Sequence, residues 1–121
     1  MTFDPGGELS AEEVADEVTT AIEQNGVTLF MKGTEHMPQC GYSRSALALL
    51  QRYVDDVTVV NVLAGPTDVY RETLEEESGW TTIPQVFVDG EFIGGADILE
   101  QLEKQGELAE KLGEESMTGP F

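Results

Sequence analysis

The chain has 121 residues, 40% of them hydrophobic, which is the size and composition of one domain with a core of its own. Its single cysteine excludes an internal disulfide and argues against a secreted, disulfide-bonded scaffold. The formal net charge is −18, from 24 acidic and six basic residues, and it argues against nucleic acid as a partner because phosphates would be repelled.

The acidic residues are spread over the whole chain rather than gathered in one segment. This distribution favours an adaptation to high intracellular salt over an acidic interaction surface, since molar salt shortens the Debye length to about 3 Å and screens the self-repulsion. The first ten residues lack the basic start and apolar run of a signal peptide, and no stretch approaches the roughly 18 apolar residues of a membrane span. We therefore expect a halophilic, soluble, cytoplasmic protein.

The first half of the chain predicts a helix, a strand, a helix and a strand. Ser10 and Glu13 have the S-x-x-E spacing of a capping box and open the first helix. Residues 27–31 and 57–63 are β-rich apolar runs typical of buried strands. Between them, apolar residues recur at helical spacing after Cys40.

The second half predicts another helix and a hairpin. An acidic helix is expected over residues 67–78, with Thr67 as its N-cap. Strands at 86–88 and 91–93 flank an Asp-Gly dipeptide, which is a strong signal for a two-residue hairpin turn.

The last predicted helix starts near Asp97, and Leu108 and Leu112 are spaced for one further turn. The order α-β-α-β-α-β-β-α predicts an α/β fold, in which a strand–helix–strand unit gives a right-handed parallel crossover and the hairpin adds an antiparallel strand. The expected result is a mixed four-stranded sheet flanked by helices on both faces.

Cys40 is followed three positions later by Ser43, where a redox dithiol motif would carry its second cysteine. It is expected at the junction of a loop and a helix, just beyond the carboxyl end of a strand, where open α/β sheets keep their sites. The free N–H groups and partial positive charge of a helix N-terminus favour thiolate over thiol. The thiolate is both a nucleophile and a metal ligand, so both uses stay open, and a small buried core cysteine is the alternative.

Three of the six basic residues could converge near this thiol, namely Lys32, Arg44 and Arg71, the alternative being ordinary surface charges. We expect His36 to be a plain exposed loop residue, because one histidine and one cysteine cannot build a four-ligand zinc site. Trp80 is expected in the core or in the wall of a ligand site.

Pro84 stands at the start of a predicted strand, where proline is normally excluded. A cis Ile83–Pro84 bond would expose the backbone groups of Ile83, to which an extended, peptide-like ligand could add as a strand. A trans proline at the strand start is the alternative. Gly94 and Gly95 allow close approach of a backbone, and Asp97 could accept bonds from a ligand's amino group, cap a helix, or do both.

The segments FMKGT, PQCGYS and WTTIPQVFVDGEFIGGAD, in this order, resemble the monothiol glutaredoxins of the CGFS type. The resemblance implies a glutaredoxin domain at residues 10–105, with an N-terminal extension at 1–9 and a C-terminal tail at 106–121. It also implies a thioredoxin-like fold with a cis proline at Pro84.

The resemblance further implies a groove for a γ-glutamyl thiol, which is glutathione in most of the family. Lys32 and Arg71 match the family residues that hold the carboxylate of the thiol, and Ile83 matches the residue whose backbone pairs with it. Ala96 and Asp97 match the positions that hold the γ-glutamyl end.

Cys40 matches the active thiol of the family, which in many members ligates a [2Fe–2S] cluster at a homodimer interface, with two protein cysteines and two small-thiol sulfurs as ligands. The leading hypothesis is therefore a homodimeric carrier that passes the cluster to iron–sulfur apo-proteins. One alternative is a monothiol disulfide oxidoreductase of at most weak activity, in which Ser43 cannot resolve the mixed disulfide. Another is an acidic adaptor with an incidental thiol.

Three positions depart from the family pattern: Tyr42 replaces the usual Phe, Thr81 replaces a Pro, and Ala96 replaces a frequent Cys. The last change removes a possible resolving thiol and weakens any two-cysteine mechanism. In a salt-loving host, γ-glutamylcysteine could take the place of glutathione.

Overall fold

The computed structural model describes residues 10–24 and 26–113, which fold into one mixed sheet between two layers of helices. The helices and strands follow in the order α1 (Ala11–Glu23), β1 (Val27–Met31), α2 (Gly41–Gln51), β2 (Val57–Asn61), α3 (Thr67–Ser78), β3 (Gln85–Val88), β4 (Glu91–Gly94), α4 (Ala96–Gln105) and α5 (Leu108–Lys111). The described helices are all too short or too polar to cross a membrane.

The sheet has the strand order β2-β1-β3-β4. β1 pairs in parallel with β2 and antiparallel with β3, and β3 pairs antiparallel with β4. This arrangement confirms the predicted mixed four-stranded sheet. The β3–β4 turn has the predicted two-residue form, since Asp89 and Gly90 both have positive φ values, of 50° and 88°.

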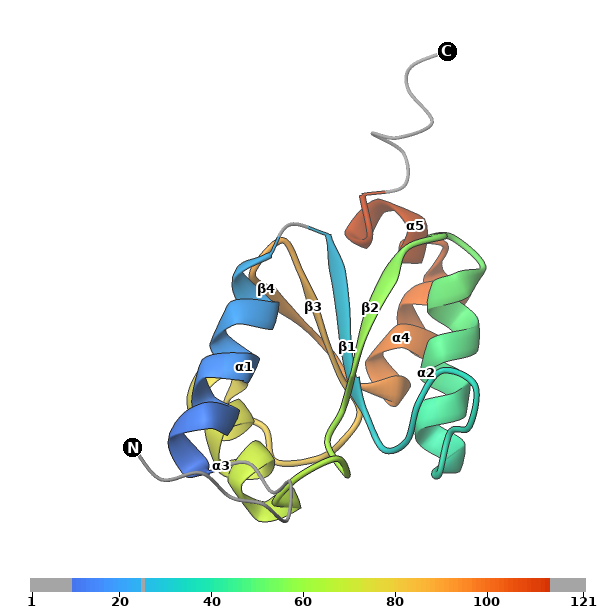
Figure 1. The fold of residues 1–121 in the computed structure, drawn as a ribbon. Coiled ribbons are helices and arrows are strands. Elements are labelled where there is room, and N and C mark those ends of the chain that lie inside the picture. The colour runs from blue at the N-terminus through green and yellow to red at the C-terminus, as the bar shows by residue number, and fades with distance from the viewer. Residues whose placement is uncertain (1–9, 25, 114–121) are drawn as a thin grey trace.

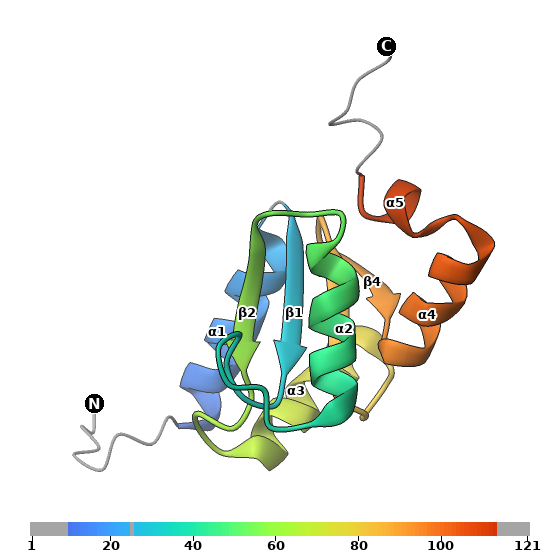
Figure 2. The ribbon, with the colours of Figure 1, turned by 90° about the vertical axis from the view of Figure 1, so that its right-hand side faces the viewer.

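Helices cover both faces of the sheet, with α1 and α3 on one side and α2 and α4 on the other (Figure 1). The view turned by 90° shows α2 in front of β1 and α1 behind the sheet (Figure 2). Leu29 and Met31 of β1 therefore pack toward α2 and α4, whereas Phe30 packs toward α1 and α3. Because both faces of β1 are covered, all five of its residues are buried, which explains its unbroken apolar run.

The predicted capping box is present at the start of α1. Ser10 Oγ accepts a hydrogen bond from the Glu13 N–H at 3.1 Å, and Glu13 Oε1 accepts one from the Ser10 N–H at 2.8 Å. Val14 and Val18, one turn apart, are fully buried against the sheet. The cap therefore fixes where the amphipathic face of α1 begins.

Two predicted boundaries between 57 and 78 are wrong. The second strand ends at Asn61 rather than at residue 63, because the Asn61 side chain accepts a hydrogen bond from the Leu63 N–H at 2.9 Å and turns the chain. Thr67 is the first residue of α3 and not its N-cap, which is Pro66. The Thr67 hydroxyl donates instead to the Val62 carbonyl at 3.0 Å.

The predicted helix start near Asp97 is confirmed, but Asp97 is not the N-cap of α4. The helix begins at Ala96, with Gly95 as an N-cap that makes no side-chain hydrogen bond. Leu108 and Leu112 are buried with α4, so the predicted further turn is present as α5 and the packed chain continues past residue 105. The expected extension at residues 1–9 and residues 114–121 of the expected tail lie outside the described part of the chain.

Candidate functional site

Cys40 lies at the N-terminus of α2, where it is the N-cap residue. The chain reaches it through a loop that is closed by a bridge between Gly33 and Pro38 and by a 2.8 Å hydrogen bond from the Gln39 N–H to the Lys32 carbonyl. Cys40 is only partly buried. It is therefore not a core residue, and its thiol is accessible at a helix N-terminus as predicted.

The pKa of the Cys40 thiol is lowered from its ordinary value, chiefly by the backbone N–H of Ser43. Partial burial acts in the opposite direction, while the N–H of Tyr42, the Ser43 hydroxyl and the charge of Lys32 lower the pKa further. The Cys40 side chain makes no capping hydrogen bond to α2. The groups named above therefore lower the pKa by favouring the thiolate form of Cys40. A larger fraction of Cys40 is therefore thiolate at neutral pH than in a free cysteine.

Ser43 connects this thiol to the end of β1. Its side chain is fully buried, and its Oγ accepts a hydrogen bond from the Lys32 N–H at 3.1 Å. A hydroxyl can accept and donate at once, and the Ser43 hydroxyl also acts as a donor toward Cys40. Ser43, which stands where dithiol motifs carry their second cysteine, is thus a hydrogen-bonding residue in this chain.

Replacing Ser43 by alanine is expected to raise the pKa of Cys40, because one donor to the thiolate is lost while the backbone donors remain. The midpoint of iodoacetamide alkylation against pH should move to higher pH. Since the Lys32 N–H also loses its acceptor, the free energy of unfolding should fall by about 1 to 3 kcal/mol. Ser45→Ala, at an exposed position of the same helix, is the control. An unchanged midpoint in Ser43→Ala would show that the hydroxyl does not act on the thiol.

A groove of about 360 Å³ brings together seven residues that the sequence analysis assigned to ligand binding. They come from the end of β1, from α3, from the loop before β3 and from the start of α4. Lys32 both lines the groove and acts on the Cys40 thiol, which itself is not among the lining residues. The groove is lined by Lys32, Tyr42, Arg71, Trp80, Thr82, Ile83, Pro84, Gly95, Ala96 and Asp97.

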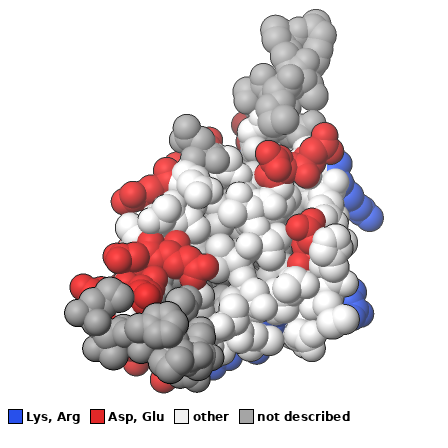
Figure 3. Space-filling view, viewed as in Figure 1, with Lys and Arg blue, Asp and Glu red and all other residues white. Residues whose placement is uncertain are grey.

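The charges in this groove are available to a ligand. The described residues contain one ion pair, between Arg52 and Glu103, so neither Lys32 nor Arg71 is neutralised by a carboxylate there. Asp97 adds a carboxylate from the first turn of α4. Acidic side chains lie in several separate groups over the face shown in Figure 3, with basic ones at its margin. Two unpaired cations with one carboxylate suit a small ligand that carries both carboxylate and amino groups.

The Ile83–Pro84 peptide bond is cis, as predicted. The antiparallel ladder between β1 and β3 starts at Gln85, so the backbone groups of Ile83 take no part in it. Gly95 packs closely on this segment, because a Cβ at that position would lie 2.9 Å from the Pro84 carbonyl oxygen. Ile83 therefore lines the groove with backbone groups that are not paired in the β1–β3 ladder.

Arg44, a predicted neighbour of the thiol, and His36, an expected surface residue, both lie outside the groove. Arg44 is exposed on α2, which agrees with an ordinary surface charge, and His36 is exposed in the loop, as expected. Across residues 10–24 and 26–113 there is no group of three or more His, Cys, Asp or Glu side chains that could hold a metal ion. A metal centre at Cys40 would therefore need ligands from other molecules.

Three residues that line or support the site were not predicted from the sequence. Tyr42 and Thr82 line the groove, and their positions beside recognised motifs could have indicated this. Asn61 Oδ1 accepts a hydrogen bond from the Gly33 N–H at 2.9 Å and so holds the loop after β1 from the end of β2. No local signal marks that contact.

Trp80 is 40% exposed and lines the groove, so it belongs to the wall and not to the core.

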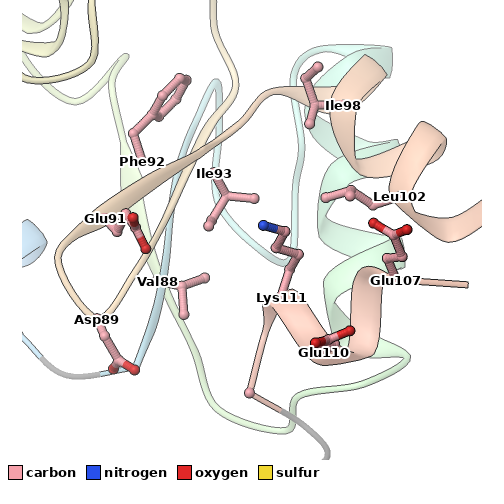
Figure 4. Close-up of a pocket in the computed structure, with 11 residues that line it drawn as sticks. Val88, Asp89, Glu91, Phe92, Ile93, Ile98, Leu102, Glu107, Glu110 and Lys111 are labelled. Carbon is pink, nitrogen blue, oxygen red and sulfur yellow. The ribbon is translucent and has the colours of Figure 1, made fainter. Parts of the chain in front are cut away.

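A larger cavity of about 880 Å³ lies between the β3–β4 hairpin and the helices α4 and α5 (Figure 4). It has an apolar floor, and its rim carries four carboxylates and one lysine: Asp89, Glu91, Glu107, Glu110 and Lys111. Four to one is also the ratio of acidic to basic residues in the whole chain, so the acidic character of this rim does not set it apart from the rest of the protein. The groove beside Cys40 is therefore the candidate site.

Comparison with known proteins shows which proteins this chain is similar to. The glutaredoxin family model matches residues 27–93. The chain is 40% identical over 99 residues to probable monothiol glutaredoxin 2 of Rickettsia typhi, covering 82% of this chain and 87% of that protein. It is 44% identical over 105 residues to the mitochondrial monothiol glutaredoxin-5 of Saccharomyces cerevisiae, covering 84% and 69%.

A solved structure extends the comparison to the fold. The solution structure of reduced poplar apo GrxS14 matches with a TM-score of 0.66 and 39% identity, covering 84% of this chain and 89% of that one. The strand order and the helices on both faces correspond to the thioredoxin-like fold expected from the sequence. That prediction is confirmed.

Proposed function

Because the chain belongs to the monothiol glutaredoxin family, we propose that it carries a [2Fe–2S] cluster bound through Cys40 and a small γ-glutamyl thiol, and passes it to iron–sulfur apo-proteins. The observation that supports this most is an accessible thiol of lowered pKa beside a cationic groove, with no further metal-ligating cluster in the described chain. A [2Fe–2S] cluster needs four ligands. Two chains and two small thiols supply four sulfurs, so the cluster-bound form is a homodimer.

The small thiol would lie in the groove. Its carboxylate would contact Lys32 and Arg71, its backbone would pair with that of Ile83, and its γ-glutamyl end would lie at Ala96 and Asp97. Three features of the groove support this orientation. They are its two unpaired cations, the backbone of Ile83 outside the ladder, and the carboxylate at the start of α4. Glutathione and γ-glutamylcysteine share the groups that it requires. The carrier would act in a salt-rich cytoplasm.

Anaerobic reconstitution with iron, sulfide and glutathione in molar KCl tests the proposal. The wild-type chain is expected to gain visible absorption and to double its mass in solution, and the Cys40→Ala variant is expected to do neither, because a cluster ligand is lost. Ser45→Ala, which changes only an exposed hydroxyl, should behave like the wild type. A colourless, monomeric wild type would refute the carrier function, and so would a chromophore that survives in Cys40→Ala.

Monothiol disulfide exchange is a second candidate, favoured by the lowered pKa of Cys40. The Cys40 thiolate would attack the glutathione sulfur of a mixed disulfide and release the substrate thiolate, which takes up a proton. A second glutathione thiolate would then attack the Cys40–glutathione disulfide, regenerating Cys40 and releasing oxidised glutathione. Rapid turnover in a mixed-disulfide assay, without cluster binding, would select this function.

A further inference from the structure

We propose that Gln85 positions the wall of the groove formed by Trp80 and Thr82, and thereby sets the affinity of the groove for its thiol ligand without contacting that ligand. The part that concerns the ligand rests on the proposed function. The part that concerns the wall stands on the geometry of the free protein.

Gln85 is the first residue of β3, and its side chain is fully buried. Its Nε2 donates to the Trp80 carbonyl at 2.9 Å and to the Thr82 carbonyl at 3.1 Å. A side-chain amide has two N–H donors, and here both are directed at the loop before the strand. Gln85 is not among the residues that line the groove, so it acts on the groove only through this loop.

The other end of the amide shows what this side chain contributes. Gln85 Oε1 is buried and has no hydrogen-bond partner among the described residues. A buried acceptor without a donor destabilises a fold, and an apolar side chain of the same length would avoid that loss. The two hydrogen bonds from Nε2 are therefore the specific contribution of glutamine at this position.

The loop has few other attachments. Residues 80–82 are exposed and belong to no helix or strand. The Trp80 N–H donates to Ser78 Oγ at 3.0 Å, which ties the loop to the end of α3, and the Trp80 ring packs edge-on against Phe92 with 5.3 Å between ring centroids. The Ser78 hydroxyl also donates to the Trp80 carbonyl, at the longer distance of 3.4 Å. Gln85 makes the shorter hydrogen bond to that carbonyl and also holds the carbonyl of Thr82.

The position of this loop affects the ligand but not the thiol. Trp80 and Thr82 line the groove next to Ile83, the residue whose backbone is expected to pair with the ligand. Cys40 is held separately, at the start of α2 and beside Ser43. Loosening the loop should therefore weaken ligand binding while the reactivity of Cys40 stays the same.

Trp80 is the only tryptophan of the chain, so intrinsic tryptophan fluorescence reports on this wall alone. In Gln85→Met, which keeps the length but removes both donors, acrylamide should quench the free protein more strongly than the wild type. Reduced glutathione, titrated in molar KCl, should bind about tenfold more weakly, the loss expected for one or two hydrogen bonds. Gln85→Glu should lose at least as much, since a carboxylate cannot donate. Gln51→Met, at an exposed position of α2, is the matched control.

The pH midpoint of Cys40 alkylation should be the same in all of these proteins. Wild-type quenching and affinity in Gln85→Met would overturn the proposal, and so would a shifted alkylation midpoint, because it would indicate general damage to the site. If Gln85→Met does not fold, hydrogen exchange of the Gln85 side-chain amide in the wild type tests the proposal instead. Slowed exchange of this amide supports the proposal, and free exchange overturns it. If the wild type binds no glutathione, the proposed function fails, and the quenching of the ligand-free proteins decides the role of Gln85.

Discussion

Raising KCl from dilute buffer to molar concentration is expected to raise the melting temperature of this protein by about 10 °C, which corresponds to about 2 kcal/mol for a domain of this size. The net charge is −18, and one ion pair, Arg52–Glu103, is formed within the described residues. Most carboxylates therefore repel one another without a cation beside them, as the separate acidic groups in Figure 3 illustrate. Salt at 1 M screens charges beyond about 3 Å and removes most of this repulsion.

Thermal melts followed by far-UV circular dichroism across a KCl series measure the effect. Salt also strengthens the burial of apolar surface, so a charge variant is needed to separate the two causes. Glu75→Gln with Glu76→Gln, at exposed positions of α3, should melt higher than the wild type in dilute buffer and gain less from KCl. A melting temperature that stays flat from dilute buffer to molar KCl would contradict the halophilic interpretation.

Replacing Gly33 by alanine is expected to lower the free energy of unfolding by about 2 to 4 kcal/mol, through backbone strain and a steric clash. Gly33 has a φ of +101°, and a Cβ there would lie 2.5 Å from the Met37 carbonyl oxygen and 2.6 Å from the Gln39 nitrogen. Both are backbone atoms, so they cannot move without opening the loop between Lys32 and Cys40. The rate of Cys40 alkylation should change as well.

Gly79→Ala is the matched control for this prediction. Gly79 has a similar φ of +83°, but a Cβ at that position would meet no atom within 4 Å. Its replacement should therefore cost only about 1 kcal/mol, the usual penalty of a left-handed conformation, and should leave Cys40 alkylation unchanged. Denaturant unfolding of both variants gives the comparison, and equal losses would show that Gly33 is not crowded.

The fold could be predicted where local signals and tertiary packing agree. The capping box at Ser10 and Glu13 and the Asp-Gly turn are each specified by neighbouring residues, and the structure has them where the sequence indicates. The errors are at the end of the second strand, which stops at Asn61, and at Thr67 and Asp97, which have the chemistry of N-caps but do not cap. The Thr67 hydroxyl instead bonds the carbonyl of Val62, five residues earlier, and the chain before Asp97 packs closely on Pro84.

The site could be predicted less completely than the fold. Cys40 and seven of the groove residues were predicted from the resemblance to a known family, whereas Tyr42 and Thr82, which also line the groove, were not. Asn61 and Gln85 do not line the groove and act through hydrogen bonds to the backbone, Asn61 to distant Gly33 and Gln85 to the loop just before it. Such contacts leave no periodicity or spacing in the sequence, so only the structure reveals them.

The central place of β1 in the sheet gives it two partner strands that leave the ribosome at different times. β1 pairs Val27 with Val57 on one side and with Val88 on the other. An early unit of β1, α2 and β2 is therefore synthesised before a late unit that begins just before β3. Lys32 belongs to the early unit, and the groove residues from Ile83 to Asp97 belong to the late one. A nascent chain thus contains its thiol before the residues that complete the groove have been synthesised.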